Sequence, residues 1–263
     1  MLDIDNLMIL KDIGYISFNC FVVGGIAVLG VLPIIENTFR ILTPYGLAEL
    51  ADQNQPLLKK LLSDAPGTFN HSLVVSQLAE AAADAIGANS VLARVGTMYH
   101  DVGKLLRPMF FVENQSFYGI ENPHNSCTPR SSKMIITAHP KDGVELAKEY
   151  HIPQIIHSFI TQHHGTSLVS YFYNEALKEE GGENIKEEQF RYPGPKPNTK
   201  ETAILMIADA VESAVRAAKS PSNEEISFDF DNEIEHFKNE VSKLGIDVVE
   251  LWKHVVSIEY DNQ

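Results

Sequence analysis

Seven histidine and aspartate side chains are spaced along this sequence in a way that suits a metal centre. His100 and Asp101 are adjacent at the end of a predicted helix, and five further candidates lie at predicted helix boundaries or inside a helix: His71, His139, His163, His164 and Asp209. Imidazole and carboxylate ligands without thiolates suit iron, manganese or zinc better than calcium. Seven ligands are too many for one ion. The set therefore predicts two metals, about 3.5–4 Å apart, that share a carboxylate and hold a bridging hydroxide able to attack phosphorus.

Asp209 is a strong candidate ligand because the residues around it in the sequence are apolar. Residues 204–208 read Ile-Leu-Met-Ile-Ala, and Ala210 follows. A lone buried carboxylate costs several kcal/mol, so Asp209 must be paired, hydrogen-bonded or bound to a metal. A salt bridge to a basic residue such as Arg216 is the alternative that this argument leaves open.

The elements that must position these residues are predicted to be helices. Apolar residues recur at helical spacing, and no strand-like alternation of any length occurs, so the predicted fold class is all-α. The predicted helices cover 68–86, 90–103, 129–137, 140–149, 153–164, 167–180, 199–219, 232–244 and 248–258. Residues 108–127 and 181–200 are rich in turn-forming residues and are predicted to be loops.

An uncharged stretch, residues 15–35, predicts a transmembrane helix near the N-terminus. At about 1.5 Å per residue, such a helix spans roughly 30 Å, the thickness of a bilayer core. The preceding residues are net acidic, which does not fit a signal peptide, and a buried core helix is the remaining alternative. Gly24, Gly25 and Gly30 would let another helix approach, which leaves a homodimer open.

Composition excludes other classes of protein. The 263 residues carry a formal net charge of −14, which argues against a protein that binds DNA or RNA polymers, because such proteins need surplus Lys and Arg. Cys20 and Cys127 share no metal-binding spacing and predict neither a thiolate site nor a disulfide framework. A small anionic substrate held by metals fits this charge balance.

Six motifs around the candidate ligands resemble the bacterial seven-transmembrane-HD proteins. These are membrane-anchored cyclic di-AMP phosphodiesterases within the HD superfamily of metal-dependent phosphohydrolases. The motifs are Asp64-Ala65-Pro66-Gly67-Thr68-Phe69-Asn70-His71-Ser72, Tyr99-His100-Asp101-Val102-Gly103-Lys104, Glu113-Asn114-Gln115 with Asn122-Pro123-His124, Gln162-His163-His164-Gly165-Thr166, Phe190-Arg191-Tyr192-Pro193-Gly194-Pro195 and Ala208-Asp209-Ala210-Val211-Glu212. The resemblance runs from the apolar span to about Pro221.

The resemblance implies an HD-domain helical bundle with a dinuclear site of two divalent transition metals, iron or manganese. One metal would be held by His71, His100, Asp101 and Asp209, and the other by Asp101, His139, His163 and His164. Asp101 would bridge them, and Lys104 would contact the scissile phosphate or protonate the leaving oxygen; an exposed helix-end lysine is the alternative. Asp101 and Lys104 are thus the catalytic candidates. The substrate-binding candidates are Lys104, Asn114, Asn122, Tyr192 and Lys196.

The implied reaction is hydrolysis of cyclic di-AMP to linear 5′-pApA by the metal-bridging hydroxide. Two alternatives stay open: an HD phosphohydrolase acting on cyclic di-GMP, a guanosine polyphosphate or a deoxynucleotide, and a catalytically silent nucleotide sensor. Members of the family carry seven membrane helices and an extracellular region, whereas one apolar span precedes the domain here. The family's function places the HD domain on the cytoplasmic side of the cell membrane.

The expected domain organisation has four parts. A transmembrane segment covers 1–36, a juxtamembrane connector 37–65 and the HD phosphohydrolase domain 66–221. A C-terminal helical extension, 222–263, is expected to pack on the HD domain.

Overall fold

A computed structural model describes residues 4–39, 42–179 and 185–219, together with residues 244, 245, 247, 249 and 251. Helices make up the regular structure of these ranges, and a single β-bridge joins Leu168 to Arg191. The all-α prediction is confirmed. The chain divides into two compact units, residues 1–45 and 46–263.

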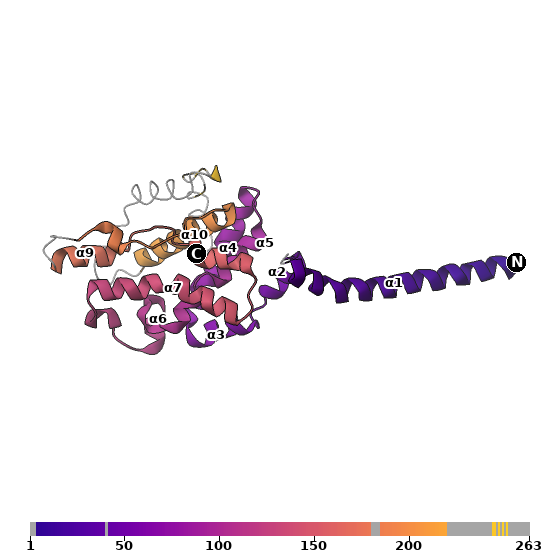
Figure 1. The fold of residues 1–263 in the computed structure, drawn as a ribbon, viewed down its shortest axis with the longest axis horizontal. Helices are drawn as coiled ribbons and strands as arrows, with labels where there is room; N and C mark the ends of the chain where they lie inside the picture. The colour runs from indigo at the N-terminus through magenta and orange to yellow at the C-terminus, as the bar shows by residue number, and fades with distance from the viewer. Residues whose placement is uncertain are drawn as a thin grey trace. The chain divides into compact units, whose positions relative to one another are not determined.

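The first unit consists of α1 (Ile4–Phe39), which Figure 1 draws as one unbroken helix. Residues Met8–Leu32 are long and apolar enough to cross a membrane, with a mean hydropathy of 2.0. This candidate span begins earlier than the predicted residues 15–35, because Met8, Ile9 and Leu10 extend the apolar surface past the charged pair Lys11-Asp12.

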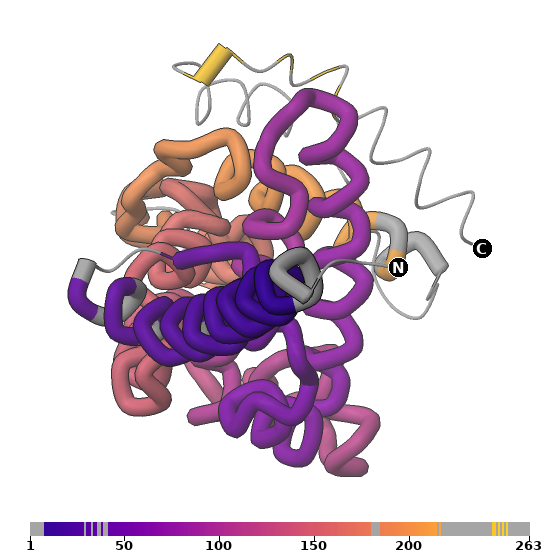
Figure 2. Tube along the Cα trace, turned by 90° about the vertical axis from the view of Figure 1, so that its right-hand side faces the viewer, coloured from indigo at the N-terminus to yellow at the C-terminus, as the bar shows by residue number. Residues whose placement is uncertain are grey.

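Four helices surround the main core of the second unit. They are α4 (Pro66–Ala85), α5 (Ser90–Tyr99), α8 (Gln154–Gln162) and α10 (Lys200–Lys219). α4 packs against both α5 and α10, and Figures 1 and 2 show α10 beside α4. Buried residues of α4 and α10, such as Leu78, Ala82, Ile204 and Ile207, meet Phe159 of α8 in one apolar cluster. This core holds the helices that carry most of the candidate ligands.

The expected connector, residues 37–65, contains two short helices, α2 (Pro44–Leu50) and α3 (Pro56–Asp64). Leu57, Leu58 and Leu61 of α3 are fully buried, and α3 packs on α4. The Tyr99 hydroxyl donates a hydrogen bond to the Leu50 carbonyl oxygen at 2.8 Å. The compact unit therefore already begins at Gly46, inside the expected connector.

The predicted helix 90–103 was wrong at its end. α5 ends at Tyr99, His100 and Asp101 form a turn, and a short 3-10 helix, η1 (Val102–Leu106), follows. The reason is a close approach to a later helix at Gly103. A Cβ atom there would lie 1.9 Å from the His139 carbonyl oxygen, so the chain must change direction before this contact.

Two further predictions about 108–149 were wrong. Residues 108–127, predicted as an irregular loop, form η2 (Pro108–Phe110), α6 (Val112–Tyr118) and η3 (Pro123–Ser126). The two predicted helices 129–137 and 140–149 are one helix, α7 (Pro129–Glu149), which continues through Pro140. Proline usually interrupts a helix, but packing of α7 on η1 and α8 supports this one.

The remaining helices agree with the sequence within a few residues. α8 and α9 (Ser170–Glu179) match the predicted 153–164 and 167–180, and α10 matches 199–219. The segment before α10 contains η4 (Glu187–Phe190) and the β-bridge residue Arg191, and is otherwise irregular where described, as expected.

The expected C-terminal extension, with its predicted helices 232–244 and 248–258, lies outside the described residues except for five positions. Among these, Leu251 is 2% exposed and belongs to the main core cluster, against which Leu244 and Val249 also pack.

We expect Gly103→Ala to destabilise the contact between η1 and α7. The new Cβ would meet the His139 carbonyl oxygen at 1.9 Å and the Gly143 nitrogen at 2.5 Å. Overpacking of this kind should lower the free energy of unfolding by about 3 kcal/mol, measured by urea denaturation. Gly119→Ala is the control, because Gly119 has a φ of +61° and open space around it, so this change reports only the cost of left-handed backbone, about 1 kcal/mol. Equal losses in the two variants would contradict the close approach.

Candidate metal centre

α4 and α10 bring His71, Asp209 and Glu212 together in the interior. His71 Nε2 lies 3.0 Å from Asp209 Oδ1, and His71 Nδ1 lies 2.6 Å from Glu212 Oε2. Asp209 and Glu212 are three residues apart on α10 and so share the face that looks toward α4. Arg216, the alternative partner considered for Asp209, instead lies 3.5 Å from Glu212.

Asp101 occupies the middle of the cluster. Its Oδ2 lies 3.6 Å from His71 Nε2 and 3.2 Å from His100 Nε2, while its Oδ1 lies 3.3 Å from His139 Nε2 and 3.6 Å from His163 Nε2. The residue is 2% exposed. Each carboxylate oxygen thus faces a different pair of imidazoles, which is the arrangement that a bridging ligand requires.

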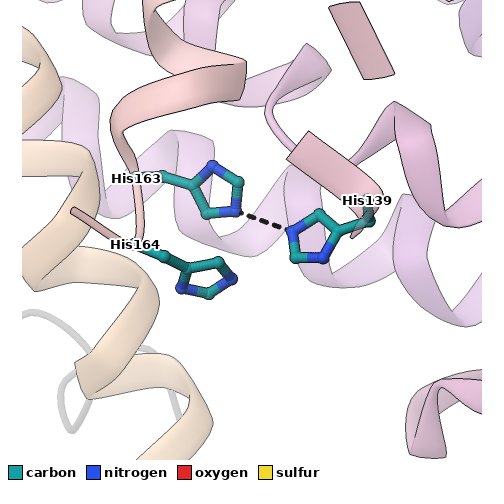
Figure 3. A group of neighbouring side chains, drawn as sticks. All are labelled: His139, His163 and His164. Carbon is teal, nitrogen blue, oxygen red and sulfur yellow. Dashed lines mark hydrogen bonds between the residues drawn. The ribbon is translucent and has the colours of Figure 1, made fainter. Parts of the chain in front are cut away.

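The histidines of α7 and α8 complete the cluster. Figure 3 shows His163 and His164 entering from the end of α8 and His139 facing them from α7. The Nε2 atoms of His139 and His163 are 3.1 Å apart, and the His164 ring lies 4.0 Å from the His163 ring between centroids. All seven predicted ligands therefore converge, and His139, His163 and His164 can offer ligand atoms within 4.8 Å of one another.

Two of the histidines are oriented by carbonyl groups at helix C-termini. His100 Nδ1 lies 2.7 Å from the Thr97 oxygen at the end of α5, and His163 Nδ1 lies 2.9 Å from the Ile160 oxygen at the end of α8. The last carbonyls of a helix lack partners within the helix, so they are available to accept these bonds. A carbonyl can only accept, so each Nδ1 carries the hydrogen and each Nε2 presents a lone pair.

Pro140 makes the Ile136 carbonyl oxygen available as the equivalent acceptor for His139 inside α7. Proline has no N–H, so the carbonyl four residues earlier, that of Ile136, loses its usual helical partner. His139 Nδ1 lies 2.7 Å from this oxygen. The imidazole is thereby held with its Nε2 lone pair toward the cluster.

The inward-facing atoms lack the partners that a buried polar group needs. His100 Nε2 and Asp101 Oδ1 are buried without a hydrogen-bond partner. His139 Nε2 and His163 Nε2 face each other although both nitrogens are acceptors, so no proton can bridge them while their Nδ1 atoms hold the hydrogens. Divalent cations bound on the two sides of Asp101 would satisfy all four atoms, and the donor set of imidazoles and carboxylates fits transition metals.

Burial and neighbouring charges shift the pKa values of three candidate ligands. Burial lowers the pKa of His139 to about 3, which keeps its imidazole neutral. Burial acts to raise the pKa of Asp101, but nearby positive charge, including the Lys104 ammonium, outweighs it and holds the pKa well below the usual range. Burial acts to lower the pKa of His71, but hydrogen bonds to Asp209 and Glu212 raise it to about 9. A proton and a metal ion would compete for the Nε2 of His71.

A polar network connects Lys104 to the loop helix α6. Lys104 Nζ lies 2.8 Å from Asp101 Oδ2 and 2.8 Å from Glu113 Oε1, and the Thr68 hydroxyl donates to the same Glu113 oxygen at 2.9 Å. The Lys104 side chain is 13% exposed, so the alternative of a solvated helix-end lysine does not hold. Asn114 donates to the Thr68 hydroxyl at 2.8 Å.

The predicted substrate-binding residues have different positions. Tyr192 stacks on the His164 ring with centroids 4.2 Å apart, and both line a cleft of about 320 Å³ along α7. Asn122 and Lys196 are exposed, and the Asn122 side chain caps η3. Asn114, in contrast, is fully buried, and its amide is engaged by Thr68 and Pro108. Its place is in the interior, not on a surface open to a nucleotide.

Sequence reasoning missed two carboxylates next to the ligands. Glu212 holds His71, and Glu113 holds Lys104. The spacing of Glu212 three residues after Asp209 was a usable signal, because both residues had to lie on one helix face. Glu113 lay in a segment predicted to be a loop, so nothing local pointed to its partner.

Comparisons with known proteins match the part of the chain that contains the cluster. A family described as "HD domain" matches residues 68–214. A cyclic-di-AMP phosphodiesterase PgpH from Listeria monocytogenes is 50% identical over 227 residues, which cover 86% of this chain and 30% of the relative. PgpH from Bacillus subtilis is 48% identical over 201 residues, which cover 76% of this chain and 28% of the relative. The chain thus spans less than a third of the length of these relatives.

A solved structure has the same fold. The crystal structure of the L. monocytogenes phosphodiesterase PgpH HD domain in complex with cyclic-di-AMP matches with a TM-score of 0.70 and 44% sequence identity. The match covers 81% of this chain and 100% of the crystallised chain.

We expect Pro140→Ala to weaken metal binding while stabilising the metal-free protein. The new backbone N–H would compete with His139 Nδ1 for the Ile136 oxygen, and removing an orienting bond typically costs 10–100-fold in metal affinity. The free energy of unfolding of the chelator-treated protein should rise by up to about 3 kcal/mol. Titration with Mn²⁺ and urea denaturation measure the two effects. Pro129→Ala is the control, since Pro129 begins α7, where no helical bond is missing; unchanged Mn²⁺ affinity in Pro140→Ala would contradict the role of Pro140.

Proposed function

This chain belongs to the HD-domain family, and on that premise we propose that it is a metal-dependent phosphodiesterase that hydrolyses cyclic di-AMP to linear 5′-pApA. The observation that carries the proposal is the cluster itself, in which four imidazole Nε2 atoms surround the buried carboxylate of Asp101. The substrate follows from the relatives, because a domain 44% identical to this chain was crystallised with cyclic-di-AMP.

The cluster divides into two positions for divalent metals, iron or manganese. Asp101 Oδ2 faces His71 and His100, with Asp209 beside them, which suits the first position. Asp101 Oδ1 faces His139 and His163, with His164 nearby, which suits the second. Two such ions, when bound, supply a nucleophile at neutral pH and Lewis acidity toward phosphate oxygens.

Lys104 is the candidate for contact with the reacting phosphate. Its ammonium group lies 2.8 Å from the carboxylate assigned to both metals, and Glu113 holds it from the other side. A phosphodiester bound at the metals would come within reach of this positive charge. Lys104 would therefore stabilise the negative charge that develops on the phosphate oxygens.

The cleft beside His164 and Tyr192 suits part of a nucleotide. Its volume of about 320 Å³ lies at the lower end of the usual range for ligand pockets. Tyr192 is the candidate for contact with a base or ribose, and Asn122 and Lys196 are exposed candidates on two flanking segments. Asn114 would contribute indirectly, because its hydrogen bonds hold Thr68 and, through it, Glu113.

α1 would anchor the protein in the cell membrane, with the HD domain in the cytoplasm. The candidate span supports the anchor, and the cytoplasmic side follows from the intracellular nucleotide that the domain would act on. Gly24, Gly25 and Gly30 have open space around them, which suits association with a second helix, including that of another copy.

The direct test is hydrolysis of cyclic di-AMP by the purified chain with Mn²⁺ or Fe²⁺, following linear pApA. We expect product from the wild type and a loss of more than about 100-fold for Asp101→Ala, since even residues that only orient a ligand contribute 10–100-fold. His157→Gln is the matched control, because His157 bonds the Ile152 carbonyl away from the cluster. If the wild type binds both metals and forms no product, cyclic di-AMP is not the substrate. A panel of other nucleotides would then distinguish a hydrolase of another nucleotide from a sensor.

Lys104→Met should lower kcat by about 10²–10³-fold, the usual effect of removing one group that stabilises transition-state charge. Bound metal should stay at the wild-type level, measured by metal analysis of the purified variant. Lys178→Met removes the charge of an exposed lysine on α9 and serves as the control. A fall in bound metal together with kcat would assign Lys104 to the assembly of the site and would contradict a role in the reaction.

A further inference from the structure

The histidines of the cluster differ in the group that holds their Nδ1 atom. His100, His139 and His163 each donate to a neutral backbone carbonyl. His71 instead donates to a carboxylate oxygen of Glu212 at 2.6 Å. An ionised acceptor makes a shorter and stronger hydrogen bond than a neutral one and increases the electron density on the far nitrogen of the ring.

Glu212 is positioned to act only through His71. The residue is 8% exposed, and its oxygen is shared between His71 Nδ1 and Arg216 Nη2, which lies 3.5 Å away. Asp209, one turn earlier on α10, contacts the other nitrogen of the same ring at 3.0 Å. The His71 side of the cluster thus gathers Asp209 and Glu212 in addition to Asp101. On the other side, Asp101 is joined by Asp209, whose Oδ2 lies 4.0 Å from His164 Nδ1, and no described contact links Glu212 to that side.

We propose that Glu212 is a positioning residue that acts through His71 and makes the metal position at His71 the tighter of the two. The inference rests on the proposed two-metal site. Its physical basis is charge. Glu212 adds a negative group that is hydrogen-bonded directly to His71 and strengthens this ligand, and Asp209 lies closer to His71, at 3.0 Å, than to His164, at 4.0 Å. The first metal added to the chelator-treated protein should therefore occupy the His71 position.

The test is a titration of the full chain in detergent with Mn²⁺, in which free Mn²⁺ is followed by electron paramagnetic resonance. Wild-type protein should show two binding steps of different affinity. Glu212→Gln keeps an acceptor for His71 Nδ1 but removes the charge, and should weaken the tighter step about 10–100-fold while leaving the weaker step within about twofold. Glu201→Gln is the matched control, because it also removes a carboxylate from α10. Glu201 lies in the first turn of this helix and accepts a hydrogen bond from the Asn89 backbone N–H.

Two single-position backgrounds assign the step. In His139→Ala, which retains the His71 position, adding Glu212→Gln should weaken the remaining step by the same factor. In His71→Ala, adding Glu212→Gln should change the remaining step by less than twofold, because Glu212 has no ligand left to act through. Equal weakening in both backgrounds, or no weakening in either, would overturn the proposal.

A misfolded variant, or a failure of the proposed function, can be distinguished from a failure of the inference about Glu212. Circular dichroism checks the helical content of each variant, and Glu212→Asp replaces Glu212→Gln if the latter does not fold; its shorter side chain should weaken the same step. The titration uses no nucleotide, so a wild type that binds two metals but leaves cyclic di-AMP intact would overturn the proposed function and not this inference.

Discussion

Asp101 is a buried carboxylate, and the positions of the surrounding side chains depend on how its negative charge is compensated. Its side chain is 2% exposed, with four imidazole Nε2 atoms within 3.6 Å and the Lys104 ammonium at 2.8 Å. The lysine compensates one oxygen, but Oδ1 has no hydrogen-bond partner. Such a group is costly unless a cation joins it. The cluster is therefore a set of side chains that could hold metal ions.

Helix ends and a proline supply the acceptors that orient this cluster. α5 and α8 stop just before His100 and His163, so their last carbonyls accept from the Nδ1 atoms of these residues. α7 does not stop at His139, yet Pro140 makes one of its carbonyls available in the same way. The carbonyl oxygens of Thr97, Ile136 and Ile160 thus fix the tautomer of three imidazoles. His71, in contrast, uses a side chain, Glu212, for this purpose.

Close backbone approaches set the distance between the two halves of the site. Gly103 of η1 lies against the His139 carbonyl and Gly143 of α7, where a larger residue would separate Asp101 from His139. Gly67 plays a similar part at the start of α4, since a Cβ there would lie 1.9 Å from the Glu113 carbonyl oxygen. This second contact lets Thr68 reach Glu113 and thereby steadies Lys104. Both glycines belong to the motifs that surround the ligands.

The helical class, the apolar N-terminal span and the seven candidate ligands could be predicted from the sequence alone, because periodicity, hydropathy and ligand chemistry are local properties. It did not determine how helices end or which distant groups meet. The turn at His100-Asp101, α6 and the unbroken α7 depend on packing against other elements, which overrides the local signals of glycine, asparagine and proline. The contact of His71 with Glu212 joins residues 141 positions apart, and that of Thr68 with Glu113 joins residues 45 apart. Such partners are chosen by the tertiary fold, because only packing decides which buried polar groups satisfy one another.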